Sequence, residues 1–214
     1  EPKGLGIATA AAADLPNRRL LLVGTDMAIG KMTAGLEIWR AAKEAGCRVS
    51  FVATGQIGMV LTGRGIPLDA IRVDYACGAV EQEVMAVKAS DLVIVEGQGS
   101  LAHPGSTSTL PLMRGACPTH LILCHRAGMT TLDTVRTNSI RVPPLLDLIR
   151  LYEDLAAACG SLPAAKTVGI SLNTAHMSEE AAASAVEQTK AQTGLLVTDP
   201  IRYGPKPLFD AVMT

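Results

Sequence analysis

Aromatic residues and net charge are both scarce in this sequence. Phe, Trp and Tyr make up 3% of its 214 residues, and the formal net charge is −1. Lys and Arg are scattered along the chain, so it lacks the positive field that attracts nucleic acids or anionic membranes. No apolar run approaches the ~20 residues that a membrane span needs. The sequence therefore predicts a small molecule as partner, with neither nucleic acid nor membrane.

Cysteine pairs with metal-binding or redox spacing are also missing. The five cysteines are odd in number and widely spaced, and no C-x-x-C pair occurs among them. A disulfide framework and a zinc site are therefore not expected. The pattern predicts reduced thiols in a cytoplasmic protein without a metal site. The cysteines are Cys47, Cys77, Cys117, Cys124 and Cys159.

The residues that are abundant indicate an α/β fold. Hydrophobic residues make up 48% of the chain, and short apolar runs alternate with helix-length segments between residues 18 and 214. Such alternation predicts one domain with a mostly parallel sheet and helices on both faces. The alanine-rich residues 1–17 are expected to form a linker or arm. The expected strands are 19–23, 48–53, 91–95, 120–124, 167–172 and 195–198, the expected helices are 31–45, 76–89, 144–158 and 178–193, and a glycine-rich loop is expected at 54–67.

A glycine loop between the first strand and the first helix is the clearest motif. Its glycines allow backbone N–H groups to surround a phosphate, and Lys31 supplies a positive charge. The loop has five residues between its glycines rather than four, and Met32 stands where a magnesium-binding hydroxyl is usual. We interpret it as the phosphate-binding loop of a three-layer P-loop NTPase-like fold; the alternative is a turn that only joins strand to helix. The expected phosphate-binding residues are Gly24, Thr25, Asp26, Gly30, Lys31, Met32 and Thr33.

A carboxylate ends the third predicted strand. Glu96 follows the apolar run 91–95 and precedes two glycines. If this strand neighbours the first, Glu96 lies close to the glycine loop, where it can hold a metal through water or accept a proton. His103, just downstream, is a second candidate for a general base. A solvated acid in a turn and a packing histidine are the alternatives.

Polar residues that follow other strands complete a predicted rim, because ligands bind at the carboxyl ends of parallel strands. Asn173 ends the fifth strand, and its amide can match the donor and acceptor edge of an adenine ring. Asn also ends strands simply because it tolerates turns, and solvated turns explain the other rim positions. The predicted substrate contacts are Gln56, Asp74, Glu81, Gln98, Ser100, His125 and Arg126.

Two resemblances follow from these motifs. The long glycine loop and Val95-Glu96-Gly97 resemble dethiobiotin synthetase and its relatives among the phosphate-loop ligases. A closer likeness, which covers nearly the whole chain from Arg19, is to a bacterial and archaeal P-loop family that includes D-glutamate N-acetyltransferases. The second likeness rests on Gly24-Thr-Asp, Gly-Lys-Met-Thr33, Thr54-Gly-Gln56, Gly78-Ala-Val-Glu81-Gln82, Val95-Glu-Gly-Gln-Gly-Ser-Leu, His103-Pro104, Leu123-Cys-His125 and Thr198-Asp-Pro with Arg202-Tyr-Gly204.

This second resemblance implies transfer of an acetyl group from acetyl-coenzyme A to the amino group of D-glutamate or a similar D-amino acid. The glycine loop would hold the pyrophosphate, Asn173 would contact adenine, and Glu96 or His103 would be the base. Arg126 or Arg202 would hold the substrate carboxylates. Met32 belongs to the pattern of that family and suits a loop that needs no tight magnesium.

Members of that family usually carry a further N-terminal domain of about a hundred residues or more. Because this sequence starts at Glu1 rather than at a methionine, we expect a processed or excised segment without that domain. A homo-oligomer is expected, as for many parallel-sheet proteins.

Two other functions stay open from the sequence. The first is an ATP- and magnesium-dependent ligase or kinase like dethiobiotin synthetase, with Lys31 on the phosphates and with Thr33 and Glu96 assisting magnesium. The second is a nucleotide-binding module without catalysis.

Overall fold

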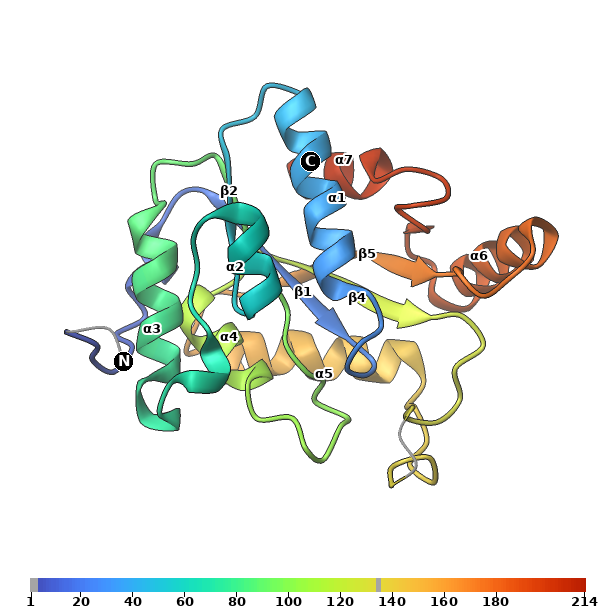
Figure 1. The fold of residues 1–214 in the computed structure, drawn as a ribbon, viewed down its shortest axis with the longest axis horizontal. Helices are drawn as coiled ribbons and strands as arrows, with labels where there is room; N and C mark the ends of the chain where they lie inside the picture. The colour runs from blue at the N-terminus through green and yellow to red at the C-terminus, as the bar shows by residue number, and fades with distance from the viewer. Residues whose placement is uncertain (1–3, 134–135) are drawn as a thin grey trace.

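The computed structural model describes residues 4–133 and 136–214, and its centre is a six-stranded sheet (Figure 1). The strand order is β2-β3-β1-β4-β5-β6, and all neighbouring strands are parallel. This arrangement confirms the P-loop NTPase-like α/β fold. The strands are β1 (Arg18–Gly24), β2 (Val49–Val52), β3 (Leu92–Val95), β4 (His120–Arg126), β5 (Lys166–Asn173) and β6 (Val197–Thr198).

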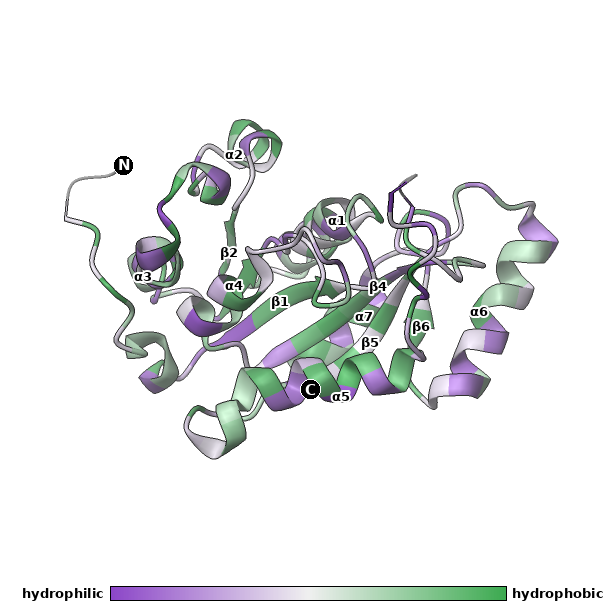
Figure 2. Ribbon diagram, turned by 90° about the horizontal axis from the view of Figure 1, so that it is seen from below, coloured by the Kyte–Doolittle hydropathy of each residue, from purple (hydrophilic) through white to green (hydrophobic). Residues whose placement is uncertain are grey.

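Helices cover both faces of the sheet and give it three layers. Because side chains alternate along a strand, Leu20 and Leu22 of β1 pack toward α1 and α7, whereas Leu21 and Val23 pack toward α3, α4 and α5. Figure 2 shows the apolar strands between these layers. The helices are α1 (Lys31–Glu44), α2 (Gln56–Thr62), α3 (Val73–Ala86), α4 (Thr109–Ala116), α5 (Leu145–Ala157), α6 (Glu179–Thr193) and α7 (Lys206–Met213), with short 3₁₀ helices at Ala11–Asp14, Leu68–Ala70 and Ala158–Gly160.

Three helices differ from the sequence expectation. The predicted glycine-rich loop 54–67 contains α2, a helix of seven residues that exposes Ile57, Val60 and Leu61 and buries Gly58. Helices α4 and α7, of eight residues each, were also not predicted. All three are about two turns long, too short for a repeating apolar pattern to stand out. Among the described residues, none of the helices combines the length and the apolar character needed to span a bilayer.

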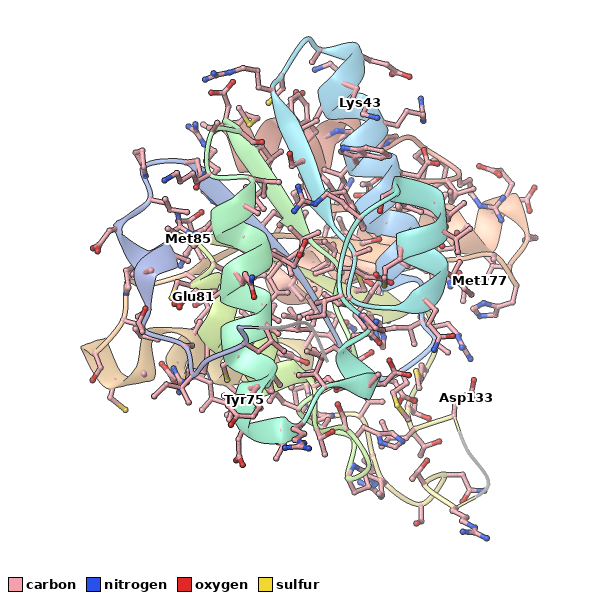
Figure 3. All side chains as sticks on the ribbon, turned by 60° about the vertical axis from the view of Figure 1, so that its left-hand side comes forward. Lys43, Tyr75, Glu81, Met85, Asp133 and Met177 are labelled. Atoms are coloured by element: carbon pink, nitrogen blue, oxygen red, sulfur yellow. The ribbon has the colours of Figure 1, made fainter. Side chains whose placement is uncertain are left out.

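The N-terminal arm packs on α3 and α4 (Figures 1 and 2). The carboxylate of Glu81, on α3 (Figure 3), accepts hydrogen bonds from the backbone N–H groups of Thr9 (3.0 Å) and Ala11 (2.8 Å) and from the Thr9 hydroxyl (3.1 Å). A Cβ at Gly78 would lie 1.9 Å from the carbonyl oxygen of Gly6, so only glycine lets the arm approach this closely. Glu81, predicted to contact substrate from the rim, therefore holds the arm instead.

Replacing Glu81 with alanine is expected to lower the free energy of unfolding by about 2–3 kcal/mol, because two backbone N–H groups of the arm lose a charged acceptor. Chemical denaturation measures this change. Asp74→Ala on the same helix is the control, because the Asp74 side chain is exposed. Equal changes in the two variants would show that Glu81 does not anchor the arm.

Candidate functional site

The carboxyl ends of four strands meet at one edge of the sheet. Strand β1, which ends at Gly24, lies between β3 and β4, and β5 lies beyond β4. Because β3 pairs with β1, Glu96 lies beside the glycine loop, which meets the condition stated in the sequence analysis. Arg126 is level with Asn173 in the β4–β5 register. The predicted phosphate, acid and amide residues therefore belong to one edge.

The glycine loop, residues 24–31, turns its carbonyl groups toward side-chain donors. The Tyr152 hydroxyl donates to the Gly24 carbonyl (2.7 Å), and the Asn173 amide donates to the Ile29 carbonyl (3.1 Å). The Arg126 guanidinium donates to the Ala28 carbonyl (3.2 Å). These three donors hold the loop through its carbonyl groups.

The same loop leaves its amide groups open. Within residues 4–133 and 136–214, no hydrogen bond is made by the backbone N–H groups of Ala28, Ile29 and Gly30. The Lys31 ammonium, 6% exposed, donates to the Asp26 carbonyl (2.6 Å). Burial lowers the pKa of Lys31, while the nearby Cys124 and Asp26 raise it. Open N–H groups beside a buried cation are the features of an anion site.

Two clefts flank the start of α1. The Asn173 cleft, about 470 Å³, includes Gly30, Thr33 and Asn173 in its lining. The Glu96 cleft, about 360 Å³, includes Met32 and Glu96. The side chains that follow Lys31 thus belong to different clefts. The remaining residues of the Asn173 cleft are Ile29, Ala34, Ser171, Ala175, Asp199, Pro200, Ile201 and Arg202, and those of the Glu96 cleft are Thr54, Gly55, Gln56, Ile57, Asp69, Gln98 and Ser108.

Glu96 is a buried carboxylate, 4% exposed, held by one of its two oxygens. Its Oε2 accepts hydrogen bonds from the backbone N–H groups of Thr54 (2.8 Å) and Gly55 (3.2 Å). Burial raises the pKa of Glu96, and these two hydrogen bonds lower it by less. A Cβ at Gly58 would lie 2.5 Å from Oε2, so glycine lets α2 cover the carboxylate. None of the described residues bonds to Oε1, which can act on a ligand in the Glu96 cleft.

The far wall of the Asn173 cleft is organised by Asp199, which the sequence analysis did not single out. Its carboxylate accepts hydrogen bonds from the Thr174 N–H (2.9 Å) and hydroxyl (2.6 Å) and from the Ile201 N–H (2.9 Å). Arg202 pairs with Glu179 at 2.5 Å and donates to the Thr174 and Met177 carbonyls. Arg202, expected to hold a substrate carboxylate, is thus engaged in fixing this wall.

The residues after β4 support the glycine loop. His125 Nδ1 lies 2.9 Å from the Thr25 hydroxyl, and burial lowers the pKa of His125 to about 4, so the ring is neutral at pH 7. Arg126, the other residue expected to hold a carboxylate, pairs with Asp133. The Asp133 N–H donates to the Asp26 carboxylate (2.9 Å). Figure 3 shows Asp133 on this loop, well apart from Glu81.

Other predicted residues lie at different places. Gln56 and Gln98 line the Glu96 cleft together with Glu96. Ser100 is fully buried, and its hydroxyl accepts from the Ala102 N–H (3.1 Å). His103, 8% exposed, accepts from the Gly105 N–H (3.0 Å), leaves its buried Nε2 without a partner, and is absent from the lining of the Glu96 cleft. Asp74 is exposed and lines neither cleft.

Tyr152 is the supporting residue that sequence reasoning missed. It lies on α5, is fully buried, and connects the Gly24 carbonyl with the Leu101 N–H (3.1 Å) of the acidic loop. In the sequence, Tyr152 is a tyrosine within an apolar helix, and this pattern is typical of an ordinary core residue. Only the packing of α5 beneath two loops gives its hydroxyl a role.

The chain is similar to known proteins in sequence and in fold. The profile of a family described as the P-loop domain of DUF1611_C, a domain of unknown function, matches residues 6–209. The chain belongs to this family. Over its full length it is 54% identical to a DUF1611 family protein from Anabaena variabilis, whose crystal structure superposes with a TM-score of 0.97 and of which it covers 61%.

Two curated relatives of this family member are named D-glutamate N-acetyltransferase. The one from Tritonibacter scottomollicae is 36% identical over 91% of the chain and 58% of its own length. The one from a Pseudoalteromonas species is 36% identical over 87% of the chain and 55% of its own length. The resemblance seen in the sequence is confirmed, and the chain spans little more than half of these relatives.

A more distant likeness concerns the fold alone. Cobyrinic acid a,c-diamide synthase from Mycobacterium smegmatis, solved with an ATP analog and magnesium, superposes with a TM-score of 0.53 at 13% identity over 92% of the chain and 93% of that protein. The three-layer architecture is shared at this distance.

Removing the Tyr152 hydroxyl in Tyr152→Phe is expected to lower the free energy of unfolding by about 1–3 kcal/mol, because a buried carbonyl and a partly buried N–H lose their partner. Denaturant titration measures the loss. Tyr203→Phe, at a tyrosine that is 40% exposed, should change stability far less. A Tyr152→Phe protein as stable as the parent would mean that water or a shifted side chain replaces the hydroxyl.

Proposed function

We propose that this protein is an N-acetyltransferase that moves an acetyl group from acetyl-coenzyme A to the amino group of D-glutamate or a similar D-amino acid. The observation that carries the proposal is the glycine loop. Its open N–H groups and Lys31 suit a pyrophosphate, and the apolar Met32 occupies the place of a magnesium ligand beside Glu96. The names of the curated relatives supply the reaction type. Unpaired cysteines suit a protein of the cytoplasm.

The Asn173 cleft is our proposed site for the adenine end of the donor. Its volume falls within the usual range for ligand sites. The Asn173 amide donates to Ile29 and its oxygen accepts from the Ala175 N–H (3.1 Å), so the side chain is fixed in orientation. The remaining donor capacity of that amide can meet the adenine edge. The pyrophosphate of the donor would then lie along the glycine loop, between the Asn173 cleft and the Glu96 cleft.

Glu96 is the proposed general base. In the reaction the substrate ammonium loses a first proton, its nitrogen attacks the thioester carbonyl carbon, and the carbon–sulfur bond breaks while the second proton of the nitrogen passes to the departing thiolate, which leaves as the thiol. Glu96 Oε1 would take the first proton, because it is unbonded and belongs to the cleft beside the loop. His103, the other candidate, does not line this cleft.

The alternative, an ATP- and magnesium-dependent ligase or kinase, needs Thr33 and Glu96 at one metal ion. These two residues line different clefts, on opposite sides of the start of α1. Magnesium-dependent ATP turnover stimulated by a carboxylate substrate would favour the ligase over the acetyltransferase.

Loss of the loop cation in Lys31→Ala is expected to weaken acetyl-coenzyme A binding about 10- to 100-fold, since a charge-assisted contact to the pyrophosphate disappears. Calorimetric titration measures the affinity. Lys190→Ala on α6, a half-buried lysine that pairs with Glu187, should bind like the parent. Equal affinities of the parent and Lys31→Ala would show that the glycine loop does not bind the pyrophosphate.

Neutralising the base in Glu96→Gln is expected to lower kcat about 10²- to 10⁴-fold with little change in acetyl-coenzyme A affinity. Burial raises the pKa of Glu96, and only the ionised carboxylate accepts a proton. As the pH decreases, the activity of the parent should therefore begin to fall at a pH above the ordinary pKa of glutamate. Glu187→Gln, at an exposed glutamate of α6, is the control. A pH profile with this limb unchanged in Glu96→Gln would assign the base to another residue.

A further inference from the structure

A third cavity, of about 890 Å³, lies between α6 and the loop that joins β4 to α5. In Figure 1 the described part of this loop leaves β4 at the right-hand end of the sheet. We call it the Arg141 cavity. His125, Thr130, Arg141, Leu145, Gln188 and Gln192 are the lining residues that matter here.

Arg141 stands on a fixed piece of backbone. It pairs with Thr131 in an antiparallel bridge, which is flanked by hydrogen bonds from the Leu132 N–H to the Ile140 carbonyl (3.0 Å) and from the Val142 N–H to the Thr130 carbonyl (2.9 Å). Within residues 4–133 and 136–214, the Arg141 guanidinium has neither an ion pair nor a hydrogen bond. The Arg141 residue is exposed, and its unpaired guanidinium can take a carboxylate through two parallel hydrogen bonds.

The charge of the cavity favours an anion. Among the described residues that line it, none is an aspartate or a glutamate, whereas Asp199 lines the Asn173 cleft, and both Asp69 and Glu96 line the Glu96 cleft. By contrast, the guanidinium groups of Arg126 and Arg202 are paired with Asp133 and Glu179. Of the three cavities, the Arg141 cavity is therefore the one with an excess of positive charge.

The remaining walls suit an organic molecule better than an inorganic ion. Gln188 and Gln192, four residues apart, present neutral amides from one face of α6. Leu145 and its neighbours Pro143 and Pro144 add an apolar side. A single cation next to amides and apolar groups matches a carboxylate on a short carbon chain, since a phosphate dianion is usually met by several donors and charges.

His125 connects this cavity to the glycine loop. The ring lines the cavity and contacts the Thr25 hydroxyl at 2.9 Å, so one side chain separates the two sites. We propose that the Arg141 cavity is a binding site for a small organic carboxylate, separate from the two clefts beside α1. This inference does not depend on the acetyltransferase.

Glutarate is the probe, titrated by calorimetry into the intact protein and into Arg141→Ala. The proposal expects parent binding that weakens at least about tenfold in Arg141→Ala and also weakens in Gln192→Ala. Arg150→Ala, an exposed arginine of α5 paired with Asp147, is the matched control and should bind like the parent. Equal melting temperatures of all variants establish that each one is folded.

Lys31→Ala and acetyl-coenzyme A test whether the Arg141 cavity is separate from the two clefts beside α1. Glutarate binding retained in Lys31→Ala and in the presence of saturating acetyl-coenzyme A supports a separate site. Absent binding in the parent, unchanged binding in Arg141→Ala, or displacement by acetyl-coenzyme A would overturn the proposal. Inorganic phosphate that binds through Arg141 more tightly than glutarate would overturn the assignment to a carboxylate. None of these measurements uses an acetylation assay. A failure of the proposed acetyltransferase function would therefore be detected separately.

Discussion

The buried ammonium of Lys31 is the constraint on which the site depends. A cation with 6% exposure is costly unless an acceptor compensates it, and the structure supplies the Asp26 carbonyl at 2.6 Å. Other carbonyl groups of the loop face protein donors, such as the Tyr152 hydroxyl and the Asn173 amide. Within the described residues, the N–H groups of residues 28–30 make no hydrogen bond. Together with the buried charge, these N–H groups are the basis of the proposed anion site.

The strand order divides the site around this loop into two clefts. With β1 between β3 and β4, the glycine loop has the acidic loop on one side and the residues after β4 and β5 on the other. Consecutive residues Met32 and Thr33 consequently line different clefts. Met32 places an apolar side chain in the same cleft as the buried carboxylate of Glu96, and the proposed role of Glu96 in proton transfer is argued from this setting.

Local sequence predicted the regular elements where apolar runs were long or bounded by glycine. The six strands and the helices α1, α3, α5 and α6 lie within about three residues of expectation at each end. The loop carrying Lys31 and the acid Glu96 were found because a motif and a strand end mark them. Helices α2, α4 and α7 were missed because two turns carry little periodicity, and Glu81 was misplaced because its partners lie about 70 residues earlier in the chain.

The sequence by itself determined the fold class, the glycine loop and the family, since these are written in local patterns of apolar residues, glycines and one lysine. Only the tertiary structure decided which side chains share a cavity. Tyr152, Asp199 and Arg141 acquire their surroundings from elements far away in the chain, and Arg126 and Arg202 lose their expected roles to acidic neighbours. Such pairings depend on strand order and helix packing, which no local pattern encodes.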